Sequence, residues 1–265
     1  MSAALVLVDA HVHVYPGARA CSLLDAAAGN FASAADHAGA GEWQGVLLLT
    51  ETASDDWFGA VASGDDTVAG WTVERCARES CSIRASRQKQ VLTIIAGRQI
   101  VTAERIEVHA FGTLARIRDG LPLRETVAAA WKAGAFVALP WGVGKWLGAR
   151  GRMVEQLLRD AEFHSVLPAD NGGRPWFWPE RRFGLDSRPV LRGSDPLPLP
   201  GEEVRVGTSG VSFPGELDAE APARDLLDRF RKLRREELRP YGPMERASRF
   251  FRNQLLLRLR KRNLT

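Results

Sequence analysis

Two histidines stand two residues apart near the end of the first apolar segment, and they are the strongest chemical signal in the chain. Residues 5–15 alternate, so Asp9, His11 and His13 are expected on one face of a strand. That spacing separates the imidazoles by about 6–7 Å along the strand. Imidazole is a good ligand for zinc, iron and related ions. The pattern predicts a metal site, although histidines hydrogen-bonded to loops would give the same pattern.

A second motif near residue 195 strengthens this prediction by resemblance. Asp9-Ala-His11-Val-His13 resembles the first-strand motif of PHP-type and amidohydrolase-type metal-dependent hydrolases, and Leu191-Arg-Gly-Ser-Asp195 resembles their last-strand motif. Segments 96–100 and 107–112 are similar to the PHP middle section. The resemblance implies a distorted TIM-like (β/α) barrel of the PHP type, with the metal held at the carboxyl ends of its strands. It also implies metal ligation by Asp195.

Several positions depart from the family pattern and reduce the expected ligand set. The departures fall at Thr50-Glu51-Thr52, Gly97-Arg98-Gln99, Pro140-Trp141 and Asp195-Pro196-Leu197. What remains is His11, His13 and Asp195, with Glu51 as a further ligand, enough for one divalent ion (zinc, manganese or iron). Such an ion would activate a water for attack on a phosphoryl or acyl centre, with Asp195 as ligand or general base. The alternative is an inactive barrel that binds a ligand or a partner.

Two of the candidate residues have equally simple structural explanations. Glu51 follows an apolar strand, where a carboxylate serves as a metal ligand, an ion-pair partner or a helix cap. His109 lies in the middle of the strand predicted over 105–111, so a packed core histidine competes with a role at the site. Both assignments stay open from sequence.

Two loops offer groups for a small anionic substrate. Residues 169–179 contain Asp170, a Gly-Gly pair, Arg174 and three aromatic residues, which suit either ligand contact or a rigid loop over the barrel mouth. Lys145 lies in a glycine-rich loop that opens a helix, where it would contact an anion or remain solvated. Arg174, Lys145, Asp170 and His109 are therefore the predicted substrate-binding residues.

The elements that position these residues alternate between strands and helices. The predicted strands cover 5–15, 45–51, 90–95, 105–111, 135–140, 164–170 and 189–192, and the predicted helices cover 23–40, 123–132, 146–162, 223–239 and 244–262. Alternation of this kind favours a parallel sheet or a (β/α) barrel. We expect a barrel over residues 1–215 and a basic helical extension over 216–265, with the Pro- and Gly-rich stretch 196–216 as a loop.

The positive charge of the chain is concentrated in its last part. Residues 221–265 hold 14 of the 36 basic residues and only 5 of the 32 acidic ones. The segment 249–262 interleaves arginines with Phe and Leu, so a helix there can pack on its own domain, bind a partner protein or lie on an anionic membrane. No nucleic-acid-binding motif accompanies it, and no specific nucleic-acid contact is expected.

The remaining composition favours a cytoplasmic protein. Three cysteines are too few for a disulfide scaffold and suit a reducing compartment. No apolar run reaches the roughly 18–20 residues that span a bilayer, and the first residues lack the basic region of a signal peptide.

Overall fold

The computed structural model describes residues 4–15 and 20–262. Its strands are β1 (Leu5–Val12), β2 (Trp43–Leu49), β3 (Thr72–Arg75), β4 (Ser82–Arg87), β5 (Gln90–Ile95), β6 (Gly97–Val101), β7 (Glu107–Phe111), β8 (Phe136–Pro140), β9 (Leu167–Asn171), β10 (Leu191–Gly193), β11 (Gly210–Pro214) and β12 (Arg239–Tyr241). Its α-helices are α1 (Ala20–His37), α2 (Trp57–Ser63), α3 (Leu123–Lys132), α4 (Gly148–Arg159), α5 (Pro222–Lys232) and α6 (Ala247–Arg262).

The strands form two open sheets. The larger has the order β12-β11-β1-β2-β5-β4-β3, and the smaller has the order β10-β9-β8-β7-β6. Among the strands that the structure describes, the parallel pairs are β1–β2, β2–β5, β8–β9 and β9–β10. The neighbours joined by short connections, such as β6 and β7, pair antiparallel because a short link cannot cross over to a parallel register.

The expected TIM-like barrel of the PHP type is therefore wrong. In the part of the chain that the structure describes, no strand ladder joins the two sheets, and the backbone hydrogen bonds between them are isolated. Glu51 next to β2 forms a single bridge to Arg98 of β6, and the Asp195 amide after β10 donates to the His11 carbonyl of β1 at 2.9 Å. A continuous ladder at both meeting points would be needed for closure. The antiparallel pairs also exclude eight repeated strand–helix units.

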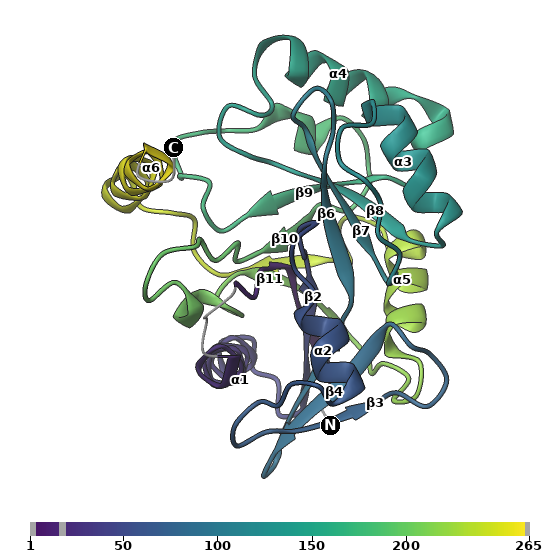
Figure 1. Cartoon of the computed structure of the whole chain (residues 1–265), viewed down its shortest axis with the longest axis vertical. Helices are drawn as coiled ribbons and strands as arrows, with labels where there is room; N and C mark the ends of the chain where they lie inside the picture. Colours follow the sequence, from purple (N-terminus) through teal and green to yellow (C-terminus); the bar gives the residue numbers. More distant parts are fainter. Residues whose placement is uncertain (1–3, 16–19, 263–265) are drawn as a thin grey trace.

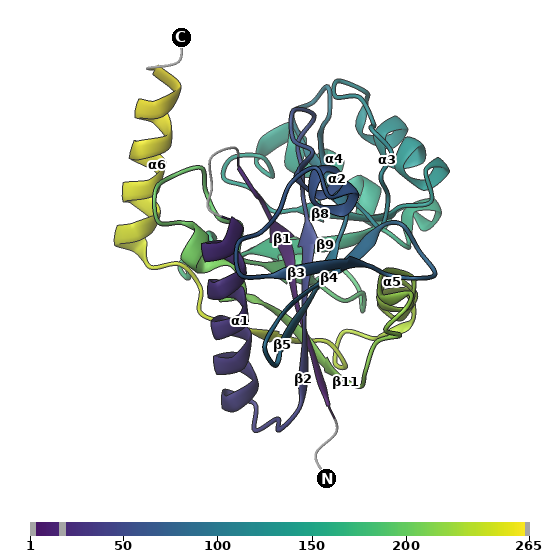
Figure 2. The ribbon, with the colours of Figure 1, turned by 60° about the horizontal axis from the view of Figure 1, so that its bottom comes forward.

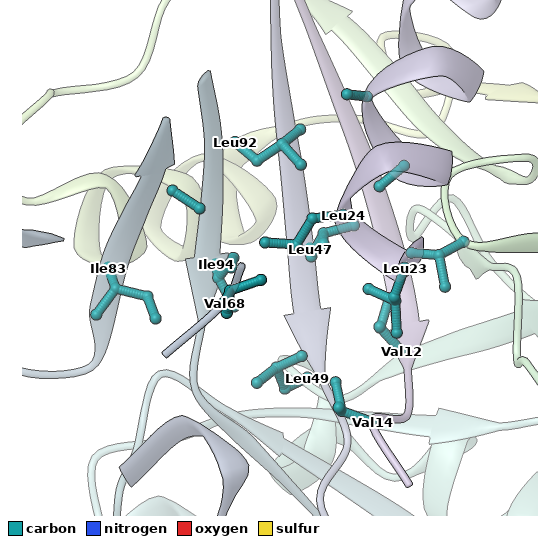
Figure 3. Close-up of a cluster of buried hydrophobic side chains, with 14 of the residues drawn as sticks. Val12, Val14, Leu23, Leu24, Leu47, Leu49, Val68, Ile83, Leu92 and Ile94 are labelled. Atoms are coloured by element: carbon teal, nitrogen blue, oxygen red, sulfur yellow. The ribbon is translucent and has the colours of Figure 1, made fainter. Parts of the chain in front are cut away.

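Three buried clusters hold these layers together. One packs α1 against the larger sheet, and Figure 3 shows its side chains, among them Leu24, Leu47 and Ile94. A second lies between the two sheets and is capped by α5, which contributes Phe230. The third packs α3 and α4 on the smaller sheet. Figure 1 shows α1 on one side of the molecule and α3 and α4 on another, with the sheets between them.

A bulge in β1 decides where the two histidines point. The register of β1 against β2 shifts between Asp9 and Val12, so that three steps along β1 match two along β2. Val12 thereby joins Leu7 in the cluster under α1, although simple alternation places it on the opposite face. The bulge turns His11 and His13 toward the smaller sheet.

The elements C-terminal to residue 215 are part of the same packing. β12 pairs with β11 at the edge of the larger sheet, and α5 fills the end of the core between the sheets. β11 itself lies in the stretch expected to be a loop, and it pairs antiparallel with β1. Among the described residues, none of the helices combines the length and the apolar character that crossing a bilayer requires.

Candidate metal centre

His11, His13 and Asp195 bring three ligand atoms together where β1 and β10 end. The Nε2 atoms of the two histidines lie 3.1 Å apart. The Asp195 Oδ1 atom is 3.3 Å from His11 Nε2 and 3.8 Å from His13 Nε2. One ligand atom from each of the three residues lies within 4.8 Å of the others. This buried group could hold a metal ion.

Asp195 is held in an unusual backbone conformation that aims one oxygen at the histidines. Its φ of +47° lies in the left-handed region, which aspartate tolerates better than most residues. Its amide is bonded to the His11 carbonyl, and Asn171 Nδ2 donates to its Oδ2 at 2.9 Å. Gly193 makes the approach possible, because a Cβ there would lie 2.2 Å from the His11 nitrogen. Oδ1 is thereby directed toward the imidazoles.

Asp9 ties the backbone behind the site together instead of facing it. Its Oδ1 accepts from the Ser194 amide at 2.8 Å and from the His11 amide at 3.2 Å. Its Oδ2 accepts from the Gly207 amide at 2.8 Å. Burial nevertheless raises the pKa of Asp9 to about 6. The carboxyl group thus fixes β1, the end of β10 and the approach to β11 in one arrangement.

Burial keeps the imidazoles neutral. It lowers the pKa of His11 to about 3, helped by the positive charge of Lys145. It lowers the pKa of His13 to about 4, with a further contribution from His11. The pKa of Asp195 is raised, mainly by burial. A neutral imidazole carries the lone pair that a metal needs, so both histidines are in the ligand form at neutral pH.

The donor set fits a borderline divalent ion. Two imidazole nitrogens and one carboxylate oxygen are the usual ligands of catalytic zinc and of related ions, which keep a further position open. His11 Nδ1 is buried without a hydrogen-bond partner among the described residues, so the protein itself supplies no outer hydrogen bond to fix the tautomer of this imidazole. Asn171 supplies the outer hydrogen bond to the carboxylate.

The three ligands lie in a pocket of about 580 Å³. One wall comes from the smaller sheet and the loop after β8, which contribute Gln99 and Lys145. The opposite wall is the inner face of α6, which contributes Asn253, Leu257 and Arg258. The basic tail expected from sequence is therefore part of the pocket. Figure 2 shows α6 standing beside the molecule as a separate helix.

His109 lies beside the ligand group but is not one of its members. It is fully buried in β7, and its ring meets the His11 ring edge-on at a centroid distance of 4.3 Å. Its Nε2 is 3.2 Å from Gln99 Oε1. Burial lowers the pKa of His109 well below its usual value. The His109 ring packs against the His11 ring, and His109 does not line the pocket.

Glu51 is engaged elsewhere. Its Oε2 pairs with Arg98 Nη1 at 3.0 Å, and its Oε1 accepts from the Phe58 amide in the first turn of α2 at 2.7 Å. Both carboxylate oxygens are thereby occupied, and the ligand group does not include Glu51. Glu51 is therefore an ion-pair partner and caps the first turn of α2, the two alternatives to metal ligation.

Asp170 and Arg174 are placed together, but away from the ligands. Arg174 Nε and Nη2 bind the two Asp170 oxygens at 2.7 Å each, and Arg174 Nη1 donates to the Trp178 carbonyl at 2.6 Å. Neither residue lines the pocket. The pair fixes the conformation of the loop that carries the aromatic residues. This agrees with the alternative that residues 169–179 form a rigid loop. Lys145 does line the pocket, where it forms an ion pair with Glu107.

Sequence analysis did not identify Asn171 and Gln99 as contributors to the site, nor α6 as its wall. Asn171 follows Asp170 at the end of β9, and strand-end position is the signal that could have singled it out. Gln99 stands out in the sequence only as a departure from a family pattern. The place of α6 depends on the path of the chain after β12, which no local pattern encodes.

Comparisons with known proteins add information on the fold only. No family model matches the chain, and no curated protein matches it. The crystal structure of PsfC from Pseudomonas syringae PB-5123 is similar over the whole length of both chains, with a TM-score of 0.57 and 16% sequence identity. These findings give no support to the PHP and amidohydrolase resemblance.

Proposed function

We propose that this protein binds one divalent metal ion through His11, His13 and Asp195 and uses it in a hydrolytic reaction on a small anionic substrate. The observation that carries the proposal is the convergence of three ligand atoms within 4.8 Å on the floor of a pocket. Zinc, manganese and iron suit this donor set. An ion there would supply Lewis acidity and a water of lowered pKa.

The surrounding residues have defined tasks in this proposal. Asn171 orients Asp195, which has one oxygen toward the histidines and can also accept a proton. Arg258 lines the pocket and supplies positive charge for the anionic group of the substrate, whereas Lys145, also in the wall, is paired with Glu107. A phosphoester is the first substrate class to test, followed by a carboxylic ester or amide.

The same pocket suits a second function, binding without catalysis. One observation favours it: beside His11 and His109 the chain carries the amide of Gln99 where a carboxylate would add a ligand. The site would then bind a metal or a metabolite as part of an interaction protein.

Hydrolysis assays on metal-loaded protein separate the two functions. The purified chain would be loaded in turn with zinc, manganese and iron and assayed with para-nitrophenyl phosphate and para-nitrophenyl acetate. The proposal expects turnover that a chelator abolishes, that His13→Ala lacks and that His164→Ala retains, since His164 is exposed and is not part of the ligand group. Bound metal without turnover of either substrate would favour the binding function.

The proposed setting is the cytoplasm. Cys21, Cys76 and Cys81 are all free. Burial raises the pKa of the Cys81 thiol to about 11, so it stays protonated and unreactive at neutral pH. Free thiols of this kind are typical of a reducing compartment.

A further inference from the structure

We infer that the outer face of α6, together with Trp176 and Phe177, is a docking surface for an anionic lipid membrane. This inference rests on the surface alone and is independent of the proposed hydrolytic function. It concerns the side of α6 that faces away from the pocket, whereas the inner side carries the pocket wall described above.

The surface is apolar and continuous across two parts of the chain. Phe251 and Leu255 on α6 are 61% and 58% exposed, and Leu259 follows on the same face at 46%. Trp176 in the loop after β9 is 69% exposed. Phe177 joins the two segments, because its ring stacks on Phe251 at a centroid distance of 6.1 Å and meets Trp176 at 5.9 Å. Exposed apolar patches of this kind mark interaction sites.

The helix is anchored on its inner side, so its outer side is presented in a fixed direction. Phe250 is buried and contacts the rings of Phe177 and Trp178. Asn253, one turn further, is also buried. Arg249 pairs with Glu202 at 2.9 Å. Figures 1 and 2 show α6 at the edge of the molecule, apart from both sheets.

Charge decides which partner fits. Residues 246–262 contain seven basic residues and no acidic ones. A symmetric dimer through this face would bring two such helices together, and their like charges would repel. An anionic membrane attracts them and also accepts the leucines and phenylalanines below its headgroups. Tryptophan is enriched at the membrane–water boundary, which suits the exposed position of Trp176.

Vesicle sedimentation tests the inference with the full chain. Vesicles of phosphatidylcholine alone would be compared with vesicles that also contain phosphatidylglycerol. We expect co-sedimentation with the anionic vesicles only, weakening as salt is raised, because exposed charges are screened. The double variant Leu255→Ser/Leu259→Ser should lower the bound fraction at least about tenfold, since two large apolar side chains no longer enter the interface.

A matched control keeps the result interpretable. Leu114→Ser/Val91→Ser removes two exposed apolar residues that lie outside the patch, and it should sediment like the unaltered chain. Thermal unfolding would confirm that both double variants fold. The inference is overturned if the chain stays in solution with anionic vesicles, or if the α6 variant binds them as well as the control does. It is also overturned if ultracentrifugation shows a dimer that only the α6 variant loses.

Discussion

Two groups of polar side chains lie at the ends of neighbouring strands of the smaller sheet, and they differ in how their charges are satisfied. At the end of β9, Asp170 and Arg174 neutralise each other through two hydrogen bonds of 2.7 Å. After β10, Asp195 faces two neutral imidazoles, and no cation in the described chain forms an ion pair with its Oδ1. Both groups are largely buried, so burial alone does not distinguish them.

The difference separates a structural cluster from a candidate site. A buried carboxylate that is already paired gains little from a metal ion, whereas one that faces neutral nitrogens has no direct ion-pair partner. Glu51, paired with Arg98, belongs with the structural kind. The missing ion-pair partner of Asp195 among the described residues, more than the presence of histidines, marks the place where a cation would be stabilised.

Removing Arg174 should have the largest effect on stability. Arg174→Ala leaves Asp170 buried without its partner, and breaking a buried pair in this way costs roughly 3–5 kcal/mol. Chemical denaturation would measure the free energy of unfolding. Arg181→Ala is the control, because that side chain is 78% exposed and its loss should change stability by less than about 0.5 kcal/mol. Equal effects of the two variants would contradict the structural role of the Asp170–Arg174 pair.

Removing Asn171 should instead weaken metal binding. Asn171→Ala deletes the hydrogen bond that directs Asp195, and loss of such an outer partner lowers metal affinity about 10- to 100-fold. Competition with a chromogenic chelator would measure the affinity. In the same assay, the metal affinity of the folded Arg174→Ala protein should stay within about twofold of that of the unaltered chain. If Arg174→Ala lost as much affinity as Asn171→Ala, the two groups would not be separate.

The smallest expected effect is on proton release. The lowered pKa values of about 3 for His11 and about 4 for His13 mean that neither imidazole carries a proton that a metal must displace at about pH 5.5. Asp195, whose pKa is raised, is the only one of the three ligands that can release a proton there. Calorimetry in buffers of different ionisation enthalpy should find at most about one proton per ion, whereas ordinary histidines would release nearly two more.

The sequence predicted the local elements better than their arrangement. The strand at 90–95 and the helix at 123–132 have the predicted bounds, because their apolar periodicity and breakers are local. The barrel prediction failed in part because β11 was not recognised as a strand: its stretch is rich in prolines and glycines, as a loop would be. In the structure β11 pairs antiparallel with β1. Strand direction depends on connections and partners that periodicity does not record.

The site was predicted in part for the same reason. His11, His13 and Asp195 come together as expected, since strand ends position them. The face from which the histidines project depends on the bulge between Asp9 and Val12. The bulge adds one residue to β1, so the side chains after it lie on the face opposite to the one that simple alternation predicts. Glu51 pairs with Arg98 and Arg174 pairs with Asp170, and the sequence did not single out either ion pair.

Elemental analysis of the purified chain tests the central claim most directly. The double variant His11→Ala/His13→Ala would be compared with His37→Ala/His164→Ala, which removes the same number of histidines from exposed positions. The proposed site predicts about one divalent ion per chain in the unaltered protein and in the exposed-position control, and none in the His11/His13 variant. Metal content that is absent from all three after incubation with zinc, manganese and iron, or equal in all three, would contradict a metal centre at His11, His13 and Asp195.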